Sequence, residues 1–312
     1  MRGAYITRPG ATIGVDMGGT KCAAVALDEN NSVLLQRRVA TRGGGDGVVS
    51  AIVDVVAELQ ADLGGIGLAP ATSVGVGVPG LVTVQGVLRF APHLPGVVEF
   101  PLLHRLLDAM PGTSVIVEND NTAAAWGEYS VGAGTGQSDM LYVGFGTGIG
   151  GGMVAGGRLL RGRHGFAGEI GHMVVDRHGE RCICGRHGCW ELLASGTALA
   201  RIAGRPGEKV TADALAGDLA ARNTLATIAA NIAVGLTDLV LLLDPGCIVL
   251  GGGVLDPPDV LLPLIAESFE RSLGEAQGHR PVPLVVAARH GARSGAIGAA
   301  LLARAAATHS AP

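Results

Sequence analysis

Aromatic and charged side chains are scarce in this chain of 312 residues. Phe, Trp and Tyr make up 3% of it and Asp, Glu, Lys and Arg 16%, whereas the hydrophobic class reaches 48%. A core with so few rings has to be built from Ala, Val, Leu and Ile, which suits a buried α/β sheet. The same composition excludes a disordered chain. At roughly 150 residues per domain, the length predicts two domains.

Positive charge is not in excess, because 23 Lys and Arg stand against 27 Asp and Glu. A formal charge of −4 argues against electrostatic binding of nucleic acid. The most apolar stretch, 232–255, is interrupted by Asp238, Asp244 and Pro245. The N-terminal residues 1–16 carry positive charge but contain no continuous apolar region of the kind found in signal peptides. We therefore expect a cytoplasmic protein that binds neither a membrane nor nucleic acid.

Cysteine is also rare, with five residues in total, which is too few for a secreted disulfide scaffold of this size. Three of them, Cys182, Cys184 and Cys189, lie within eight positions and follow His172. Three thiolates and one imidazole match a structural Zn²⁺ site, and four protein ligands leave no open position on the metal. A redox cysteine pair and buried inert thiols are the alternatives. His187 competes with His172 as the fourth ligand, and we expect His172 to be used.

Glycine, by contrast, is abundant, and its 51 residues gather after strand-like runs. Strand, glycine turn and strand are predicted from Ala11 through the turn 17–20, and again from Asp139 through the turn 146–152. The pattern GxxxxGK[ST] is absent, and the GxGxxG match that begins at Gly146 continues as β sequence where a dinucleotide site would open a helix. Two interpretations remain open. The segments can be two phosphate-binding turns that face each other across a cleft, or two ordinary hairpins.

Polar side chains at these turns point to nucleotide chemistry. Thr20, Lys21 and Thr147 would add side-chain donors to the backbone N–H groups of the glycines. Asp16 ends the first predicted strand directly before its glycine turn. A carboxylate at this place can hold Mg²⁺ beside a triphosphate, although an Asp that only supports the turn is an equally ordinary reading.

Further acidic residues stand at a strand end and beside the cysteine cluster. Asp120 follows the run SVIVEN and precedes a predicted helix, where it can accept a proton from a substrate hydroxyl. A simple helix cap by Asp120 or Asn121 is the alternative. Glu169 and Glu191 flank the cysteines and can accept hydrogen bonds from vicinal sugar hydroxyls, or they can be a surface residue and a first-turn helix acid.

Taken in order along nearly the whole chain, these motifs resemble the ROK family of bacterial sugar kinases and repressors. The resemblance rests on 16–21 (DMGGTK), 118–120 (END), 146–152 (GTGIGGG), 168–172 (GEIGH) and the cysteine cluster that ends at Glu191. It implies an α/β, actin-like and hexokinase-like ATPase fold of two domains with a cleft between them. The expected domains are 1–121, with the helix 294–306 packing back on it, and 122–293, which carries the zinc cluster.

The resemblance also implies an ATP-dependent hexose kinase that uses Mg²⁺ and a structural Zn²⁺, with Asp120 as general base. The nucleotide would be bound by the two turns and by a third glycine run near the adenosine, that is by Asp16, Gly18, Gly19, Thr20, Lys21, Gly146, Thr147, Gly148, Gly251, Gly252 and Gly253. The sugar would be held by Gly80, Asn119, Asp120, Glu169, His172 and Glu191. His172 would have one ring nitrogen on zinc and the other toward the sugar.

The chain departs from the family pattern at two positions. Asn121 stands where alanine is frequent, and His93 stands where asparagine is more often found. These departures bear on which sugar is bound. Glucose is the expected acceptor, with N-acetylglucosamine or N-acetylmannosamine as the alternative, and polyphosphate is a conceivable donor. A repressor would need a DNA-binding module ahead of Asp16, where only 15 residues stand. By resemblance, the protein is expected to be a homodimer or homotetramer.

Overall fold

The computed structural model describes residues 10–274 and 279–309, and the chain folds into two compact units. Within the described residues, the first unit contains 10–131, 161–167 and 293–309, and the second contains 132–160, 168–274 and 279–292. The expected division placed the boundary after residue 121; the contacts place it after Val131 and return 161–167 to the first unit. Most of the N-terminal segment, for which no signal sequence is expected, lies outside the described residues.

The main sheet of the first unit has the strand order β3-β2-β1-β4-β8. Its strands are β1 (Thr12–Met17), β2 (Lys21–Leu27), β3 (Val33–Ala40), β4 (Ser73–Val78) and β8 (Ser114–Asn119). β1, β2 and β3 pair antiparallel, whereas β4 and β8 run parallel to β1. The carboxyl ends of β1, β4 and β8 therefore meet at one edge of the sheet. A smaller sheet consists of β5 (Leu81–Val82), β6 (Leu88–Phe90) and β7 (Val98–Phe100).

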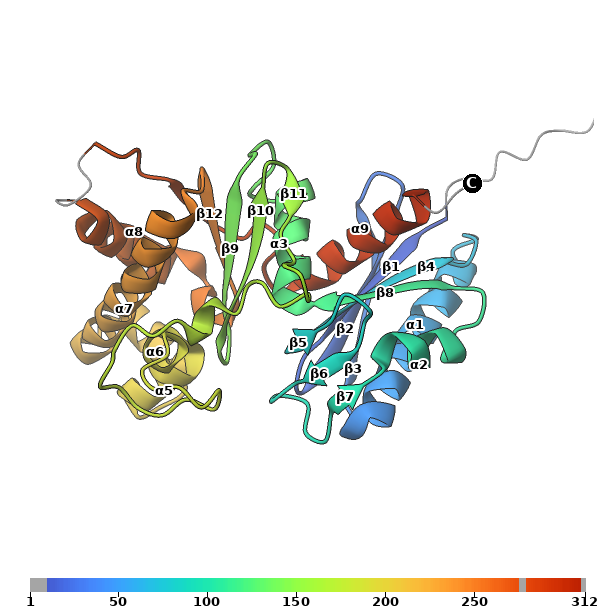
Figure 1. Ribbon diagram of the computed structural model, residues 1–312, viewed down its shortest axis with the longest axis horizontal. Coiled ribbons are helices and arrows are strands. Elements are labelled where there is room, and N and C mark those ends of the chain that lie inside the picture. The colour runs from blue at the N-terminus through green and yellow to red at the C-terminus, as the bar shows by residue number, and fades with distance from the viewer. Residues whose placement is uncertain (1–9, 275–278, 310–312) are drawn as a thin grey trace, which may run out of the picture. The chain divides into compact units, whose positions relative to one another are not determined.

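Helices cover both faces of this sheet (Figure 1). They are α1 (Gly44–Gly65), α2 (Leu102–Ala109), α3 (Asp120–Val131) and α9 (Ser294–His309). α1 and α2 lie on one face, and α9 lies against the other face with α3 beside it. The approach of α9 is close because β1 offers a glycine: a Cβ on Gly14 would meet the backbone of Ala296 and Ala300. The C-terminal helix α9 therefore packs on the sheet of the first unit.

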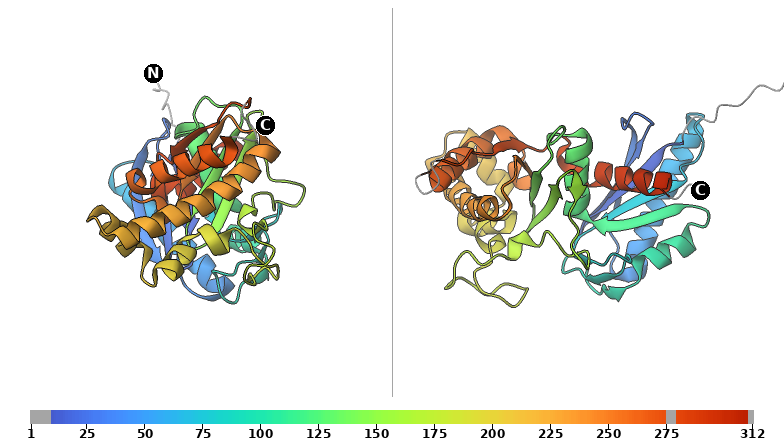
Figure 2. Two further views of the ribbon diagram at one scale, coloured as in Figure 1. Left: turned by 90° about the vertical axis from the view of Figure 1, so that its left-hand side faces the viewer. Right: turned by 45° about the horizontal axis from the view of Figure 1, so that its top comes forward.

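The second unit contains a sheet of the order β11-β10-β9-β12-β13. Its strands are β9 (Met140–Phe145), β10 (Ile149–Ala155), β11 (Arg158–Leu159), β12 (Cys247–Gly251) and β13 (Leu284–Ala287). The helical elements are η1 (Ile170–His172), α4 (Glu191–Ala194), α5 (Gly196–Ala203), α6 (Gly207–Leu215), α7 (Leu219–Leu243), η2 (Gly253–Leu255), α8 (Pro258–Gly274) and η4 (Gly291–Arg293), of which Arg293 belongs to the first unit. Figure 2 shows α7 and α8 side by side, and their apolar residues share one core with β9 and β12.

The two sheets repeat one pattern, since each consists of three antiparallel strands followed by two parallel ones. The strand, turn and strand sequences predicted from Ala11 and Asp139 form the hairpins β1–β2 and β9–β10. Each glycine turn sits at the end of the first strand of its sheet. The similarity of the two sequence segments therefore reflects a repeated supersecondary unit.

α7 is long and apolar enough to cross a membrane, by length and composition only, and half of its most apolar window is buried within the protein. Its buried residues, among them Ile228, Ile232 and Leu236, belong to the core of the second unit. Burial of this kind is typical of the core helix of a globular unit.

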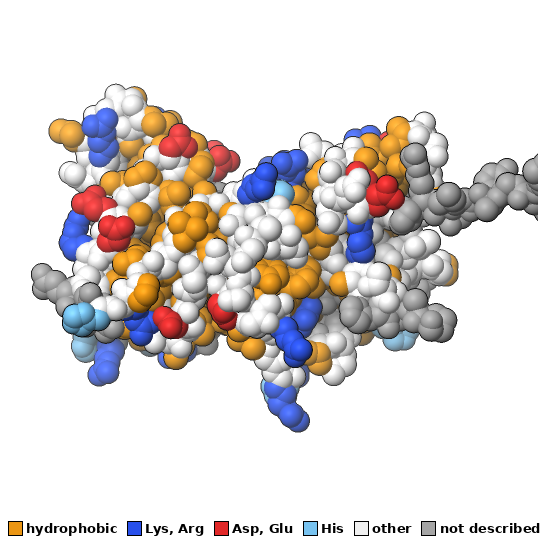
Figure 3. Space-filling model, turned by 90° about the horizontal axis from the view of Figure 1, so that it is seen from above, with side chains coloured by type: hydrophobic (Ala, Val, Ile, Leu, Met, Phe, Trp, Pro, Cys, Tyr) orange, Lys and Arg blue, Asp and Glu red, His pale blue; other side chains and the backbone are white. Residues whose placement is uncertain are grey.

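On the face drawn in Figure 3, acidic and basic side chains are both scattered among hydrophobic and uncharged ones.

Candidate functional site

The first glycine turn joins β1 to β2 and is held by its own backbone. The Gly18 N–H donates to the carbonyl of Lys21 at 2.8 Å, and the Thr41 hydroxyl donates to the Gly18 carbonyl at 2.7 Å. Gly19, Thr20 and the Lys21 side chain are exposed beyond this closed turn. The turn therefore presents backbone and side-chain donors of the kind that bind phosphate oxygens.

Asp16 lies at the carboxyl end of β1, directly before this turn. Burial raises the pKa of Asp16 to about 7, and the negative charge of Asp120 acts in the same direction. The start of α9 packs against this carboxylate, since a Cβ on Gly295 would lie 2.9 Å from its carboxyl carbon. A desolvated carboxylate near a second acid is the kind of group that a divalent cation stabilises.

Asp120 and Asn119 stand at the junction of β8 and α3. The cap of α3 is made by Asn119, whose Oδ1 accepts the Thr122 N–H at 3.0 Å, and not by Asp120 or Asn121 as the capping alternative supposed. The Asn119 side-chain amide also donates to the Gly80 carbonyl at 3.2 Å, which ties this junction to the turn after β4. With the helix capped by its neighbour, the carboxylate of Asp120 is available for chemistry.

The Asp120 side chain is partly buried, and its Oδ1 accepts two hydrogen bonds from Asn121. Burial raises the pKa of Asp120 above the ordinary value, while the hydrogen bonds from Asn121 and the imidazole of His93 oppose that shift. A carboxylate with a raised pKa is a better proton acceptor than an exposed one.

The residue before this junction is fixed by an ion pair. Glu118 is 7% exposed, and its Oε2 accepts a hydrogen bond from Arg161 Nε at 2.5 Å. Its Oε1 accepts the Asn119 N–H at 3.1 Å. Arg161 begins the segment 161–167 that returns to the first unit, so this segment fastens the end of β8.

The second glycine turn joins β9 to β10 in the other unit. The Gly146 N–H donates to the Gly148 carbonyl at 3.0 Å, and the Thr197 hydroxyl donates to the Thr147 carbonyl at 2.7 Å. A Cβ on Gly148 would lie 2.7 Å from Oε2 of Glu191. The turn and Glu191 belong to two motifs that are separate in the sequence, and the fold places them in contact.

The third glycine run, 251–253, lies at the end of β12 next to β9. Gly252 has a φ of +91°, and a Cβ there would collide with the Phe145 backbone, whereas Gly253 has open space around its Cα. The run thus continues the edge of the sheet that carries the second glycine turn. A flat backbone surface of this kind suits close approach of a ligand.

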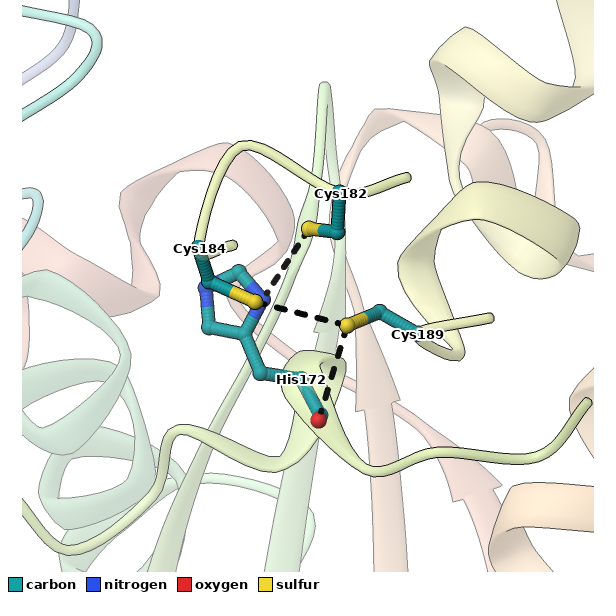
Figure 4. A group of neighbouring side chains, drawn as sticks. All are labelled: His172, Cys182, Cys184 and Cys189. Carbon is teal, nitrogen blue, oxygen red and sulfur yellow. Dashed lines mark hydrogen bonds between the residues drawn. The ribbon is translucent and has the colours of Figure 1, made fainter. Parts of the chain in front are cut away.

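The predicted zinc ligands converge in the second unit (Figure 4). Nδ1 of His172 lies 3.6 Å from Sγ of Cys182, Sγ of Cys184 lies 3.5 Å from Sγ of Cys189, and all four ligand atoms lie within 4.8 Å of one another. Tetrahedral Zn²⁺ with Zn–S bonds of about 2.3 Å places its sulfur atoms about 3.8 Å apart. The donor set therefore fits zinc. His187 is exposed and its ring nitrogen lies near the Gly179 carbonyl instead.

Both flanking carboxylates lie beside His172. Oε1 of Glu191 is 3.4 Å from Nδ1 of His172, and Oε2 of Glu169 is 3.9 Å from its Nε2. The two ring nitrogens thus face different groups, Nδ1 toward the Cys182 thiol and Glu191, and Nε2 toward Glu169. This arrangement agrees with an imidazole that has one nitrogen for a metal and one for a ligand.

Three residues near the site, His93, Asn121 and Arg161, are not among the predicted site residues. His93 approaches the first glycine turn, because a Cβ on Gly19 would lie 2.9 Å from the His93 carbonyl oxygen. Asn121 donates to Asp120, and Arg161 pairs with Glu118 from 43 positions away. Only the two departures from the family pattern, at Asn121 and His93, could have drawn attention to the first two; no local signal marked Arg161.

Comparisons with known proteins agree with these motifs. The model of the ROK family matches residues 12–306. The chain belongs to the ROK family. It is 37% identical to a glucokinase of Streptomyces coelicolor over 95% of this chain and 98% of that protein. It is 33% identical to an N-acetylmannosamine kinase of Salmonella heidelberg over 94% and 98%.

A solved structure supports the fold as well. The crystal structure of a ROK family glucokinase from Streptomyces griseus in complex with glucose and AMPPNP has a TM-score of 0.87 and 38% identity, over 95% of this chain and 100% of that one. The predicted α/β, actin-like ATPase fold is confirmed by this likeness and by the repeated sheet pattern.

Proposed function

We propose that this protein transfers the γ-phosphoryl group of ATP to the 6-hydroxyl of a hexose, and that glucose is its acceptor. Membership of the ROK family and 37% identity to a glucokinase support an ATP-dependent sugar kinase. The main support for the chemistry is the pair of carboxylates in the first unit. Asp16 lies near the carboxyl end of β1 and Asp120 begins α3, and the charge of Asp120 contributes to the raised pKa of Asp16.

In this proposal Asp120 is the general base. Its carboxylate accepts the proton of the 6-hydroxyl as the hydroxyl oxygen attacks the γ-phosphorus, and the bond to the bridging oxygen of ADP breaks. The raised pKa of Asp120 favours this proton transfer. The glycine turns bind the phosphates through their backbone N–H groups, with Thr20, Lys21 and Thr147 as further donors, and the run 251–253 lies against the adenosine.

Two metal ions belong to the proposal. Asp16 would hold Mg²⁺, which neutralises phosphate charge when it is bound. The cluster of His172 with Cys182, Cys184 and Cys189 would hold a structural Zn²⁺. This cluster fixes Glu191 and Glu169 beside it, and we propose that both carboxylates and Nε2 of His172 hydrogen-bond to sugar hydroxyls.

On the first unit, Asn119 and the turn at Gly80 would contribute further sugar contacts. Their mutual hydrogen bond keeps both in place. Gly80 has a φ of +102°, and a Cβ there would meet the Phe90 carbonyl, so only glycine keeps this turn close to β6.

The test is ADP release in a coupled assay with Mg-ATP, in which glucose, N-acetylglucosamine, N-acetylmannosamine, mannose and fructose are compared on one preparation. We expect the highest kcat/KM with glucose. The 33% identity to an N-acetylmannosamine kinase makes N-acetylmannosamine the second candidate, and a higher kcat/KM with that sugar would replace glucose. Polyphosphate in place of ATP tests the donor.

The role of Asp120 is tested separately with Asp120→Asn and Asp120→Ala. Loss of a general base should lower kcat by about 10²-fold to 10⁴-fold and change the KM for glucose far less. A variant that retains near-normal turnover would refute the assignment.

The protein is further proposed to be a homodimer or homotetramer and to be cytoplasmic. Light scattering tests the oligomeric state, and subcellular fractionation tests the location.

A further inference from the structure

Asn121 is the second residue of α3 and follows the proposed base directly. Its backbone N–H donates to Oδ1 of Asp120 at 2.8 Å, and its side-chain Nδ2 donates to the same oxygen at 3.0 Å. Both hydrogen bonds from Asn121 therefore end on one oxygen of the carboxylate. A carboxylate oxygen that accepts two directed hydrogen bonds is held in one rotamer.

We propose that Asn121 is a positioning residue for phosphoryl transfer: it fixes Oδ1 of Asp120 so that Oδ2 is presented to the acceptor hydroxyl. The proposal rests on Asp120 as the base and adds the group that orients it. Geometric control of this kind matters because a proton acceptor has to lie within hydrogen-bond distance of the hydroxyl at the moment of attack.

The side chain of Asn121 is not required to end or begin the helix. Asn119 already caps α3 through the Thr122 N–H. At the second helical position Asn is a weaker helix former than Ala, so a purely structural view predicts that Asn121→Ala leaves the helix intact or stabilises it. The side-chain amide of Asn121 therefore acts on the Asp120 carboxylate and is not needed to cap α3.

A neutral amide also suits the task better than a cation would. An Arg or Lys at this distance would stabilise the ionised carboxylate strongly and weaken it as a base, whereas an amide orients the carboxylate with a smaller effect. Burial raises the pKa of Asp120 and the hydrogen bonds from Asn121 lower it. The net effect is a raised pKa, so the carboxylate is more basic than an exposed one.

The experiment compares Asn121→Ala with Asn121→Asp, which has nearly the same shape as asparagine but lacks the side-chain N–H donor. For both variants we expect kcat to fall about fivefold to tenfold, with the KM values for glucose and ATP within about twofold of wild type. The midpoint of thermal unfolding of Asn121→Ala should be unchanged or higher.

A double-mutant cycle separates positioning from a general structural effect. In the Asp120→Asn background there is no base to orient, so Asn121→Ala should have no further effect on the residual turnover. An equal fold-loss in both backgrounds would overturn the proposal. So would a kcat of Asn121→Ala within twofold of wild type, or wild-type kcat in Asn121→Asp.

The two proposals fail in different ways. If Asp120→Asn retains turnover, the base assignment itself is wrong. If Asp120→Asn has lost turnover and Asn121→Ala has not, the base assignment holds and only the positioning role is refuted.

Discussion

Glu118 and Arg161 form an ion pair in which the carboxylate is almost completely buried and the guanidinium is partly exposed. Nε of Arg161 donates to Oε2 of Glu118 at 2.5 Å, and the side chains are 9% and 40% exposed. The other oxygen of Glu118 accepts the N–H of Asn119, the residue before the proposed base. A side chain from a returning segment therefore supports the backbone that presents Asp120.

Arg161→Ala should destabilise the protein and lower turnover together. The substitution leaves a buried carboxylate without its cation, and we expect a loss of about 2 kcal/mol in the free energy of unfolding, less than for a fully buried pair because the Arg161 side chain is partly exposed. Arg163→Ala, two positions further along and exposed, is the matched control. Urea unfolding measures the stability of the two variants, and the coupled assay measures their turnover. Equal stabilities of the two variants would contradict the role of the ion pair.

The choice between two histidines gives a prediction about metal content. His172→Ala removes a ligand of the proposed zinc and should release the metal, whereas His187→Ala should retain one zinc per chain. Elemental analysis after dialysis measures the content. Removal of zinc by a chelator should also lower the thermal midpoint, because the cluster closes the loop 172–189. Retention of zinc by His172→Ala and its loss from His187→Ala would reverse the assignment.

The raised pKa of Asp16 predicts how the free energy of unfolding depends on pH in the protein without bound Mg²⁺. Its folded-state pKa is about 7 and its ordinary value is 3.8, so between these values the folded state binds more protons than the unfolded state. The free energy of unfolding should therefore fall as pH rises through this window. Asp16→Asn should remove this component and be more stable than wild type at pH 8.

Magnesium provides the control for that prediction. It should stabilise wild type at pH 8 and have little effect on Asp16→Asn, and turnover of the variant should be strongly reduced. Thermal midpoints of both proteins at pH 4.5 and pH 8, with and without Mg²⁺, test the sign. A variant that is less stable than wild type at pH 8 would refute it.

Close packing of β1 on α9 predicts opposite effects for two glycine substitutions. Gly14→Ala would place a methyl group in the backbone of α9 and should cost about 2 kcal/mol or more. Gly64→Ala lies in α1, where a Cβ meets nothing within 4 Å, and should stabilise the protein by a few tenths of a kcal/mol. Equal thermal midpoints of the two variants would contradict this packing argument.

Local patterns in the sequence were sufficient to predict several local features of the candidate site. The hairpins around both glycine turns, the strand that ends before Asp120 and the four proposed zinc ligands all follow from spacing and residue type, because each depends on residues that are neighbours along the chain. The identity of the α3 cap did not follow. The sequence suggested Asp120 or Asn121 as the cap, and only the direction of the side chains in the structure shows that Asn119 caps the helix.

The sequence by itself determined the family, the repeated strand and turn units and the residue types present at each turn. Only the tertiary structure decided that Arg161 meets Glu118, that Glu191 lies beside Gly148, and that the first unit continues through α3 to Val131. The physical reason is distance along the chain. Contacts between residues 43 positions apart depend on how whole strands and helices pack, and no local spacing encodes that packing.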